Sequence, residues 1–391
     1  MMEGSKMSIW ETKSIGDLCS RFSSGKNITA DRISEQGKYP VYGGNGLRGY
    51  TNNYNFDGKC VLIGRQGAYC GNVRYFEGKA FMSEHAIVAV ANSENCTRYL
   101  AYKFDTMKLG RFSGQAAQPG LSVGKLAKLS IQVPSLPKQE KISSILSTYD
   151  NLIEANNRKI DLLEQVAQEL YKEWFVRFRF PGYENAKFEN GLPERWELKK
   201  IGDIAHVKSG YAFKSEWWID EGVPVVKIKD IQGNTIDFGD LSHVSEDHAE
   251  IAKQFYIVEG DLLIAMTGAT IGKMALVPYS EKQMVVNQRV GKFFLGESPS
   301  EKVAFLYMTL QQNWVQELIV MIAGSNAAQP NISPFDIEKI KVVYNEDMVD
   351  EYNRRSAPFI EEILQLRKQN QNLATQRDML LPRLMSGKLE V

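Results

Sequence analysis

The sequence has few of the residues that build metal sites or disulfide frameworks. It contains four cysteines (Cys19, Cys60, Cys70 and Cys96) and four histidines among 391 residues. The cysteines form no Cys-x-x-Cys pair, which zinc sites and redox motifs commonly use. His243 and His248 lie in a polar stretch without a third ligand, so we interpret both as surface residues. We expect reduced thiols and no metal on this chain.

Long apolar runs and an excess of charge are also missing. No segment reaches the roughly 18 to 20 apolar residues of a membrane helix, and residues 1–10 lack the pattern of a secretory signal. We therefore expect a cytoplasmic protein without a membrane partner. Basic and acidic residues balance at 47 each, which excludes nucleic-acid binding by bulk charge alone. An aromatic content of 10% is too high for a disordered chain.

An internal duplication is the strongest feature that is present. Trp10, Ile15, Gly16 and Asp17 recur as Trp196, Ile201, Gly202 and Asp203. Val-Leu-Ile-Gly-Arg-Gln-Gly at 61–67 matches Leu-Leu-Ile-Ala-Met-Thr-Gly at 262–268, and Ala-Ala-Gln-Pro-Gly-Leu-Ser at 116–122 matches Ala-Ala-Gln-Pro-Asn-Ile-Ser at 327–333. The offset grows from 186 to 211, so the second copy carries insertions. Each copy has the size of a domain rather than of a solenoid repeat.

The duplication divides the charge unevenly. Residues 1–138 carry a net charge of +8, residues 139–190 of −2, residues 191–345 of −5 and residues 346–391 of −1. Short β-branched and aromatic runs separated by glycine turns predict strands near 39–42, 59–64, 86–90, 223–228 and 260–266. One amphipathic helix is expected in each copy, over 97–108 and 301–320. Each copy is therefore predicted to be a strand-rich α+β globule.

Each copy is followed by a segment with a coiled-coil pattern. Apolar residues alternate at spacings of four and three over 142–174 and 359–384, which predicts a helical seam. The predicted seam residues are Ile153, Asn156, Ile160, Leu163, Leu170, Ile363, Leu366, Asn370, Leu373 and Leu380. We expect the two helices to pair antiparallel, giving a pseudo-twofold arrangement. The predicted organisation is a first globule at 1–138, a first helix at 139–180, a linker at 181–195, a second globule at 196–345 and a second helix at 346–391.

One asparagine interrupts each seam, at Asn156 and Asn370. If the two are opposed, Leu163 faces Ile363 and Tyr149 faces Arg377; otherwise each is a tolerated polar residue on an exposed edge. Pro358 and the Ser147–Asp150 segment suggest that each tail starts with a short turn, breaks and resumes as one long helix. The helices are expected to end by Pro181-Gly182 and near Pro382.

This ordered set of repeats resembles the specificity subunit of type I restriction-modification enzymes. The resemblance rests on the two Trp entrances, the two Ala-Ala-Gln-Pro segments, the Leu-rich tails and Tyr39–Gly49, and it covers essentially the whole chain. It implies that each globule reads one half of a bipartite site on double-stranded DNA. It also implies that the helices set the spacing and dock two adenine-methyltransferase subunits, and that motor-nuclease subunits join the assembly. S-adenosylmethionine, ATP and magnesium would then belong to those partners.

The sequence itself supports a non-catalytic role. It has no Asn/Asp-Pro-Pro-Tyr/Phe motif and no phosphate-binding GxxxxGK[ST] loop. Gly44–Gly49 matches GxGxxG formally, but a turn-rich stretch follows instead of a helix, which argues against a dinucleotide site. Such a glycine loop is either purely structural or approaches DNA phosphate through backbone N–H groups. Two alternative functions remain at this point: a coiled-coil scaffold without a DNA role, and a degenerate single-chain methyltransferase or nuclease.

Discrimination between two half-sites requires residues that differ between the copies. Gln118 and Gln329 are shared, so we expect them to hold a common turn rather than to read bases. Arginine suits guanine edges and phosphates, and glutamine suits adenine. The candidate DNA-binding residues beside Gly-rich or polar turns are Arg48, Arg65, Gln66, Arg74, Arg111, Lys208, Lys214, Lys227, Lys229, Thr267, Lys273, Gln288 and Arg289. Each has a plainer interpretation as a solvated surface residue. For Tyr42, Tyr50 and Tyr211 we expect core packing.

Overall fold

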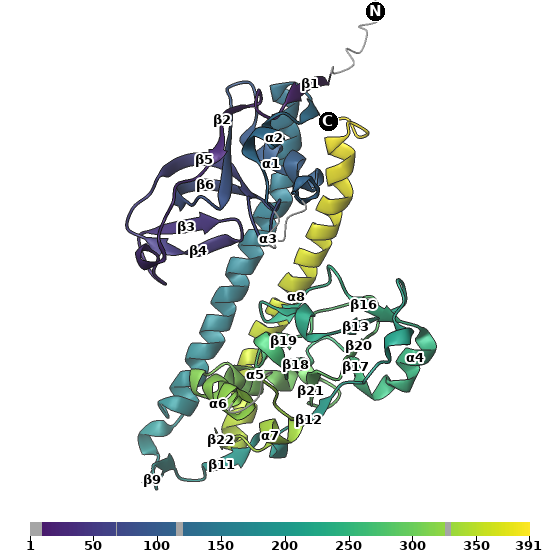
Figure 1. Ribbon diagram of the computed structural model, residues 1–391. Helices are drawn as coiled ribbons and strands as arrows, with labels where there is room; N and C mark the ends of the chain where they lie inside the picture. The colour runs from purple at the N-terminus through teal and green to yellow at the C-terminus, as the bar shows by residue number, and fades with distance from the viewer. Residues whose placement is uncertain (1–9, 68, 115–119, 325–329) are drawn as a thin grey trace, which may run out of the picture. The chain divides into compact units, whose positions relative to one another are not determined.

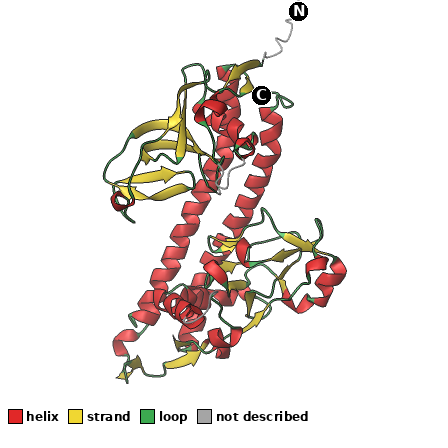
Figure 2. Cartoon of the chain, in the orientation of Figure 1, coloured by secondary structure: helices red, strands yellow, loops and turns green. Residues whose placement is uncertain are grey.

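The computed structural model describes residues 10–67, 69–114, 120–324 and 330–391. The chain divides into two compact units, one formed by residues up to Leu152 with Leu373–Val391, the other by Ile153–Asn372. Two long helices, α3 (Leu136–Tyr171) and α8 (Glu346–Met385), each contribute residues to both units. Figure 1 follows the chain by residue number, and Figure 2 shows strands and helices in each unit. The predicted α+β class is confirmed.

The first globule is built on one six-stranded sheet with the order β2-β7-β5-β6-β3-β4. Only β3 and β6 run parallel among its described pairs. A two-stranded sheet of β1 and β8 closes the globule. The elements are β1 (Glu11–Ser14), β2 (Cys19–Ser24), β3 (Tyr39–Gly43), β4 (Gly46–Thr51), β5 (Phe56–Gly64), β6 (Val73–Met82), β7 (Ala86–Ala91), α1 (Thr97–Thr106), α2 (Val123–Ala127) and β8 (Ser130–Val133).

The central strand β5 is buried on both faces. Side chains alternate along a strand, so Val61 and Ile63 join the cluster that contains α1, while Cys60 and Leu62 join a second cluster on the other face. Both faces are covered, and this explains why 60–63 reads as a continuous apolar run rather than an alternating one. Burial of the Val61, Leu62 and Ile63 side chains stabilises the fold by roughly 1.5–3 kcal/mol each.

The second globule is larger and contains two four-stranded sheets. Their orders are β12-β21-β18-β19 and β16-β13-β20-β17, with β13 and β20 parallel. The strands are β11 (Glu197–Lys200), β12 (His206–Ser209), β13 (Val223–Val226), β14 (Ile231–Gln232), β15 (Thr235–Ile236), β16 (Ser242–Val244), β17 (Tyr256–Ile257), β18 (Leu262–Ala265), β19 (Met274–Leu276), β20 (Met284–Val286), β21 (Val290–Phe294) and β22 (Lys341–Tyr344). The helices are α4 (Glu246–Ile251), α5 (Pro299–Leu310), α6 (Asn313–Gly324) and α7 (Pro334–Glu338). A hairpin of β9 (Phe188–Glu189) and β10 (Leu192–Pro193) precedes the globule.

In the second unit α3 and α8 run antiparallel around a polar centre. Asn156 Nδ2 donates to Asn370 Oδ1 at 2.8 Å, so the two seam asparagines are opposed as one of the sequence interpretations predicts. Deeper in the unit, the Glu164 carboxylate accepts hydrogen bonds from Arg367 (3.0 Å), from the Tyr307 hydroxyl (2.7 Å) and from Asn234 (3.1 Å). The β14–β15 turn, the globule helix α5 and both long helices therefore meet at one carboxylate.

The first unit contains a second group of the same kind. Arg377 on α8 donates to Asp150 on α3 at 2.8 Å, and the hydroxyl of Tyr102 on α1 donates to the other oxygen of Asp150. Lys103 also donates to the backbone carbonyl of Met385 at 3.0 Å. In each unit, then, one tyrosine of a globule helix and one arginine of α8 share a carboxylate of α3.

The predicted helices need two corrections. Neither tail breaks after a short turn: α3 is continuous through 147–150 and α8 is continuous through Pro358. A proline removes only one backbone bond and leaves the apolar face intact, and Tyr352 and Ile360 are buried on either side of it. The helix ends agree with the expectation. The helix α3 ends at Tyr171 and a π-helical turn over Lys172–Val176 follows, so the first long helix ends before Pro181-Gly182. The helix α8 ends at Met385, near Pro382, and its last residues Leu384 and Met385 are buried.

The second correction concerns the helix predicted over 301–320, which is two helices, α5 and α6, separated at Gln311 and Gln312. The other predicted elements are confirmed: strands occur at or within all five expected segments, and α1 lies within 97–108. In the part of the chain that the structure describes, no helix is sufficiently long and apolar to cross a membrane.

Candidate nucleic-acid interface

The two copies share a set of loops held by equivalent backbone hydrogen bonds. In the first copy the loop between β5 and β6 bonds to the segment before α2, through Leu121 N and Arg65 O at 2.9 Å. In the second copy Ile332 N donates to Met266 O at the same distance. The isolated bridges Gln66↔Gly120 and Thr267↔Asn331 repeat this relation. We define the loop set of each globule as these two segments with the contacts described next.

The same loops also contact the turn that precedes β7 or β21. Arg65 N donates to His85 O at 2.9 Å, and Met266 N donates to Arg289 O at 3.0 Å. The second residue after β2 and its counterpart after β12 join the set, because Lys26 N donates to Met82 O and Tyr211 N to Val286 O, both at 2.9 Å. These bonds align the copies residue by residue where sequence offsets alone are ambiguous.

Equivalent backbone positions in the two loop sets carry different side chains. The pairs are Lys26 and Tyr211, Arg65 and Met266, Gln66 and Thr267, Asn72 and Lys273, Glu84 and Gln288, and His85 and Arg289. A shared backbone with exchanged hydrogen-bonding groups has the chemistry needed to distinguish different base edges. The shared Gln118 and Gln329 lie outside the described residues.

In the first globule four polar residues of the loop set lie in contact with one another. The Gln66 amide oxygen lies 3.2 Å from His85 Nδ1, and His85 Nε2 lies 3.1 Å from a Glu84 carboxylate oxygen. The Arg65 guanidinium approaches the backbone carbonyl of Glu84 at 3.5 Å. These contacts keep four polar side chains together at one end of the sheet.

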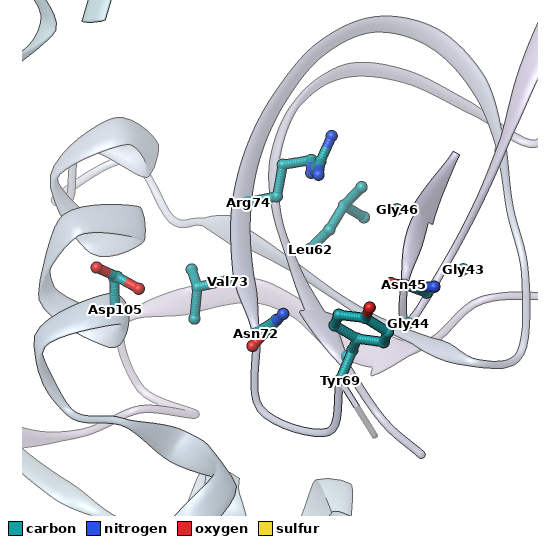
Figure 3. Close-up of a pocket in the computed structure, with 11 residues that line it drawn as sticks. Gly43, Gly44, Asn45, Gly46, Leu62, Tyr69, Asn72, Val73, Arg74 and Asp105 are labelled. Carbon is teal, nitrogen blue, oxygen red and sulfur yellow. The ribbon is translucent and has the colours of Figure 1, made fainter. Parts of the chain in front are cut away.

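A polar pocket lies beside this loop set. It has a volume of about 370 Å³ and lies between the β3–β4 turn, the β5–β6 loop and α1 (Figure 3). The lining side chains with hydrogen-bonding capacity are Asn45, Tyr69, Asn72, Arg74 and Asp105. Arg74 also stands close over Gly46, where an added Cβ would lie 3.1 Å from the guanidinium.

Two glycines of the first globule are required by geometry. Gly46 has a φ of +93° at the β3–β4 turn, and Gly71 has a φ of +90°. This is the left-handed region that favours glycine. A Cβ on Gly71 would also lie 2.0 Å from the backbone nitrogen of Gly110. The glycine loops predicted from sequence are thus structural parts of the site.

Arg48 and Arg111 lie in the same globule but not in the loop set. Arg48 is exposed on β4, with its side chain against Gly43. Arg111 lies over the Phe112 ring with its guanidinium 4.7 Å from the centroid. Tyr42 packs edge-on against Phe76 at 5.1 Å, which agrees with the expected core role.

The second globule presents an aromatic and cationic cluster beside its loop set. Trp217 stacks between Tyr211 at 6.2 Å and His248 at 4.1 Å, with interplanar angles of 8° and 9°. Lys214 lies 5.3 Å from the Trp217 ring, and Lys227 lies 3.5 Å from the Trp218 ring. Stacked rings with adjacent cations are suited to contacts with bases and phosphates.

Several sequence candidates in the second globule are already engaged within the protein. Thr267 is only 5% exposed and its hydroxyl donates to the Pro330 carbonyl at 3.0 Å. Lys229 pairs with Asp240 at 2.8 Å. Lys227 donates to Ser242 at 2.8 Å, and burial lowers its pKa. Thr267 is therefore the least suited of the candidates to contact a ligand.

Five candidates of the second globule remain accessible: Lys208, Lys214, Lys273, Gln288 and Arg289 are exposed. Lys208 lies 5.2 Å from the Phe294 ring. His248 is half-buried and stacked, and His243 is also half-buried, so neither is the plain surface residue that the sequence suggested. Among the residues that the structure describes, no three His, Cys, Asp or Glu side chains gather as metal ligands would.

Sequence reasoning missed Lys26, Tyr69, Asn72, Glu84 and His85. Two of them belong to the Ser-Glu-His-Ala segment at 83–86, whose counterpart is the Asn-Gln-Arg-Val segment at 287–290. The offset there is 204, between the values of the flanking repeats, and the residue types differ at every position. Only the backbone contacts make this equivalence evident.

Comparison with known proteins agrees with this architecture. The family of the type I restriction modification DNA specificity domain matches residues 7–165 and 193–344. The type I restriction enzyme MjaVIII specificity subunit of Methanocaldococcus jannaschii is 23% identical over 401 residues, covering 98% of this chain and 93% of that protein. The EcoprrI specificity subunit of Escherichia coli is 38% identical over 144 residues, which is 36% of each chain.

A solved structure has the same fold. The type I restriction-modification S subunit from M. genitalium superimposes with a TM-score of 0.59 at 19% identity, over 98% of both chains. The two matched family segments each contain one of the loop sets described above. The chain therefore belongs to the family of type I restriction-modification DNA specificity subunits.

Proposed function

We propose that each globule reads one half of a bipartite DNA site, with α3 and α8 setting the distance between the halves and docking two adenine-methyltransferase subunits. The family establishes the coarser statement: the chain is a non-catalytic DNA-recognition subunit of a type I restriction-modification system. Motor-nuclease subunits would complete the assembly. S-adenosylmethionine, ATP and magnesium would bind to the partners, and action on cellular DNA implies a cytoplasmic location.

The observation that supports this proposal is the loop set. Its backbone hydrogen bonds are equivalent in the two globules, whereas its side chains differ. Two different half-sites require one scaffold with two sets of hydrogen-bonding groups. The domain boundaries that we propose remain those predicted from sequence, with globules at 1–138 and 196–345. Of the sequence candidates, we retain Arg48, Arg65, Gln66, Arg74 and Arg111 in the first globule. In the second globule we retain Lys208, Lys214, Lys273, Gln288 and Arg289.

A domain exchange tests the two-reader proposal. Residues 11–135 would be replaced by the first globule of another family member, and the chain would be expressed with its methyltransferase partner. Single-molecule sequencing of the methylated DNA is expected to show a change in one half of the motif only. The matched exchange of residues 197–344 should change the other half. A change in both halves, or in neither, would refute the proposal.

Salt dependence tests the contacts with phosphate. The slope of log K against log salt is negative, and each neutralised phosphate contact makes it steeper by about 0.9. The first globule carries the excess positive charge. In the assembled complex, R48Q/R74Q should therefore make the slope less steep by a larger amount than K208Q/K214Q does. The control K59Q/K79Q removes two lysines from β5 and β6, where they pair with Glu77 and Asp57, and it should leave the slope unchanged. Equal slopes for all three variants would contradict this assignment.

Two further assays exclude the alternative functions. Retention of the chain on a specific duplex in the presence of competitor DNA would exclude a scaffold without a DNA role. The purified chain should transfer no methyl group from S-adenosylmethionine until the partner subunit is added. Methylation or cleavage by the chain alone would instead support a degenerate single-chain enzyme.

A further inference from the structure

We propose that Glu84 and His85, on the turn between β6 and β7, read a base pair of the first half-site. They would do so from the positions that Gln288 and Arg289 occupy in the second globule. The inference rests on the proposed function and names the residues that give the first globule its own specificity. Neither residue stands out in the sequence, because the two turns share no residue types.

The equivalence of the two turns rests on four pairs of backbone hydrogen bonds. Ser83 N donates to Tyr42 O and Asn287 N to Val226 O, which follow the parallel pairs β3–β6 and β13–β20. In the first globule three more bonds hold the turn: Ala86 N donates to Ser83 O, Gly25 N to Ala86 O, and Arg65 N to His85 O. Their counterparts in the second globule, in the same order, are Val290 N to Asn287 O, Gly210 N to Val290 O, and Met266 N to Arg289 O. Because these bonds lie on both sides of each turn, Glu84 corresponds to Gln288, and His85 corresponds to Arg289.

The Glu84 carboxylate has unused capacity to accept hydrogen bonds. One of its oxygens pairs with His85 Nε2 at 3.1 Å. The other oxygen is buried and has no hydrogen-bond partner among the described residues. An ionised carboxylate offers about four lone-pair positions, and leaving a buried oxygen unpaired is unfavourable. The side chain as a whole is 30% exposed, so part of it is accessible to a ligand.

The neighbouring side chains support Glu84 in one position. His85 lies between Glu84 and the Gln66 amide oxygen, and Arg65 approaches the Glu84 carbonyl. Three residues from two loops thus orient a single acceptor. A base contact needs such a fixed side chain, because a freely rotating one discriminates poorly.

The chemistry of the two turns predicts different base edges. A carboxylate only accepts hydrogen bonds, so Glu84 should select a base with a major-groove amino group, cytosine N4 or adenine N6. Gln288 both donates and accepts, which suits adenine, and Arg289 suits guanine. The two turns would therefore impose different preferences at corresponding places of the two half-sites.

The test uses the isosteric variant E84Q in the complex with the methyltransferase partner. Methylation rates are measured on duplexes that carry every single-base substitution in both half-sites. E84Q is expected to reduce discrimination at one position of the first half-site about 5- to 150-fold, the equivalent of about 1–3 kcal/mol for a base contact. The second half-site profile should not change. Q288E is the reciprocal variant and should alter only the second half-site.

E94Q is the matched control. It removes the same charge from the same globule at an exposed residue outside the loop set, where Glu94 pairs with Lys13, and its base profile should equal that of the unchanged chain. An E84Q profile identical to that of E94Q would overturn the inference, as would a uniform loss of rate on every duplex. If Q288E still acts on the second half-site in that case, the two-reader function stands and only the assignment of Glu84 fails. If domain exchange also leaves both half-sites unchanged, the proposed function itself fails.

Discussion

Replacing Arg367 with methionine should destabilise the second unit strongly. The Arg367 side chain is 7% exposed and its guanidinium lies 3.0 Å from the Glu164 carboxylate, whose side chain is 15% exposed. R367M leaves that carboxylate buried without its cation. Removal of one partner of a buried ion pair costs about 3–5 kcal/mol. Glu164 keeps its bonds from Tyr307 and Asn234, so we expect a value near the lower limit, about 3 kcal/mol.

The matched variant is the double replacement E164M/R367M, which removes both charges. Replacing a buried ion pair with apolar residues is often neutral or stabilising. Here the Tyr307 hydroxyl and Asn234 lose their acceptor, and each loss costs about 1 kcal/mol. The double variant should therefore be more stable than R367M, although it carries one more substitution. Since the two residues are in direct contact, their effects should be non-additive by more than about 1 kcal/mol.

Thermal unfolding followed by tryptophan fluorescence suits this comparison. Five of the six tryptophans (Trp174, Trp196, Trp217, Trp218 and Trp314) belong to the second unit, and only Trp10 belongs to the first. The second unit has about 220 residues, so an unfolding entropy of about 2.1 cal/mol/K per residue converts 3 kcal/mol into a Tm decrease of about 6–7 °C. The reasoning is refuted if E164M/R367M melts at or below R367M, or if R367M melts within about 1 °C of the unchanged chain.

Three further outcomes are expected. Burial raises the pKa of Asp261 above its ordinary value of 3.8, even though Lys292 lies 2.6 Å away. As the pH falls, the folded protein therefore takes up a proton at Asp261 before the unfolded chain does, and the carboxyl group becomes less destabilising to the folded state. The Tm of the unchanged chain should therefore gain on that of D261N as the pH falls toward about 4, the ordinary range of an aspartate, and a shift in favour of D261N would contradict this. G71A places a Cβ within 2.0 Å of the backbone of Gly110, whereas at Gly272, where φ is +80°, the nearest atom is the flexible Gln316 side-chain oxygen at 2.7 Å. Calorimetry should therefore show that the free energy of unfolding falls by more than about 3 kcal/mol for G71A and by about 1 kcal/mol for G272A. Equal losses of stability would refute the clash. S333A removes the Oγ that accepts a hydrogen bond from Asp336 N at 3.2 Å at the start of α7. In a urea titration it should lower the free energy of unfolding by about 1 kcal/mol. S333T keeps the hydroxyl and should lower it by less.

Local patterns predicted the elements that depend on local physics. Apolar runs between glycine turns located β3, β5, β7, β13 and β18, and the four-three spacing located the two long helices. The opposition of Asn156 and Asn370 was also accessible, because a polar residue in a seam is best satisfied by another one. These inferences succeed because side-chain period and turn chemistry are properties of short segments.

Helix boundaries and candidate contacts were less accessible. Pro358 predicts a break by its own chemistry, but Tyr352 and Ile360 are buried on either side and hold α8 together. Thr267 had the sequence context of a recognition residue, yet its hydroxyl bonds to Pro330, 63 positions away. In both places contacts made in the folded protein determine the local structure, and a pattern of neighbouring residues cannot predict such contacts.

The sequence by itself determined that the chain has two related α+β globules and two helical tails, because duplication, strand periodicity and heptad spacing are written in residue order. Only the tertiary structure decided which side chains act together. The parallel pairs β3–β6 and β13–β20 place the 83–85 and 287–289 turns beside loops that are distant in sequence. Non-local strand pairing is set by the packing of the whole sheet rather than by any one strand. Glu84 and His85 became candidates for base recognition for that reason alone.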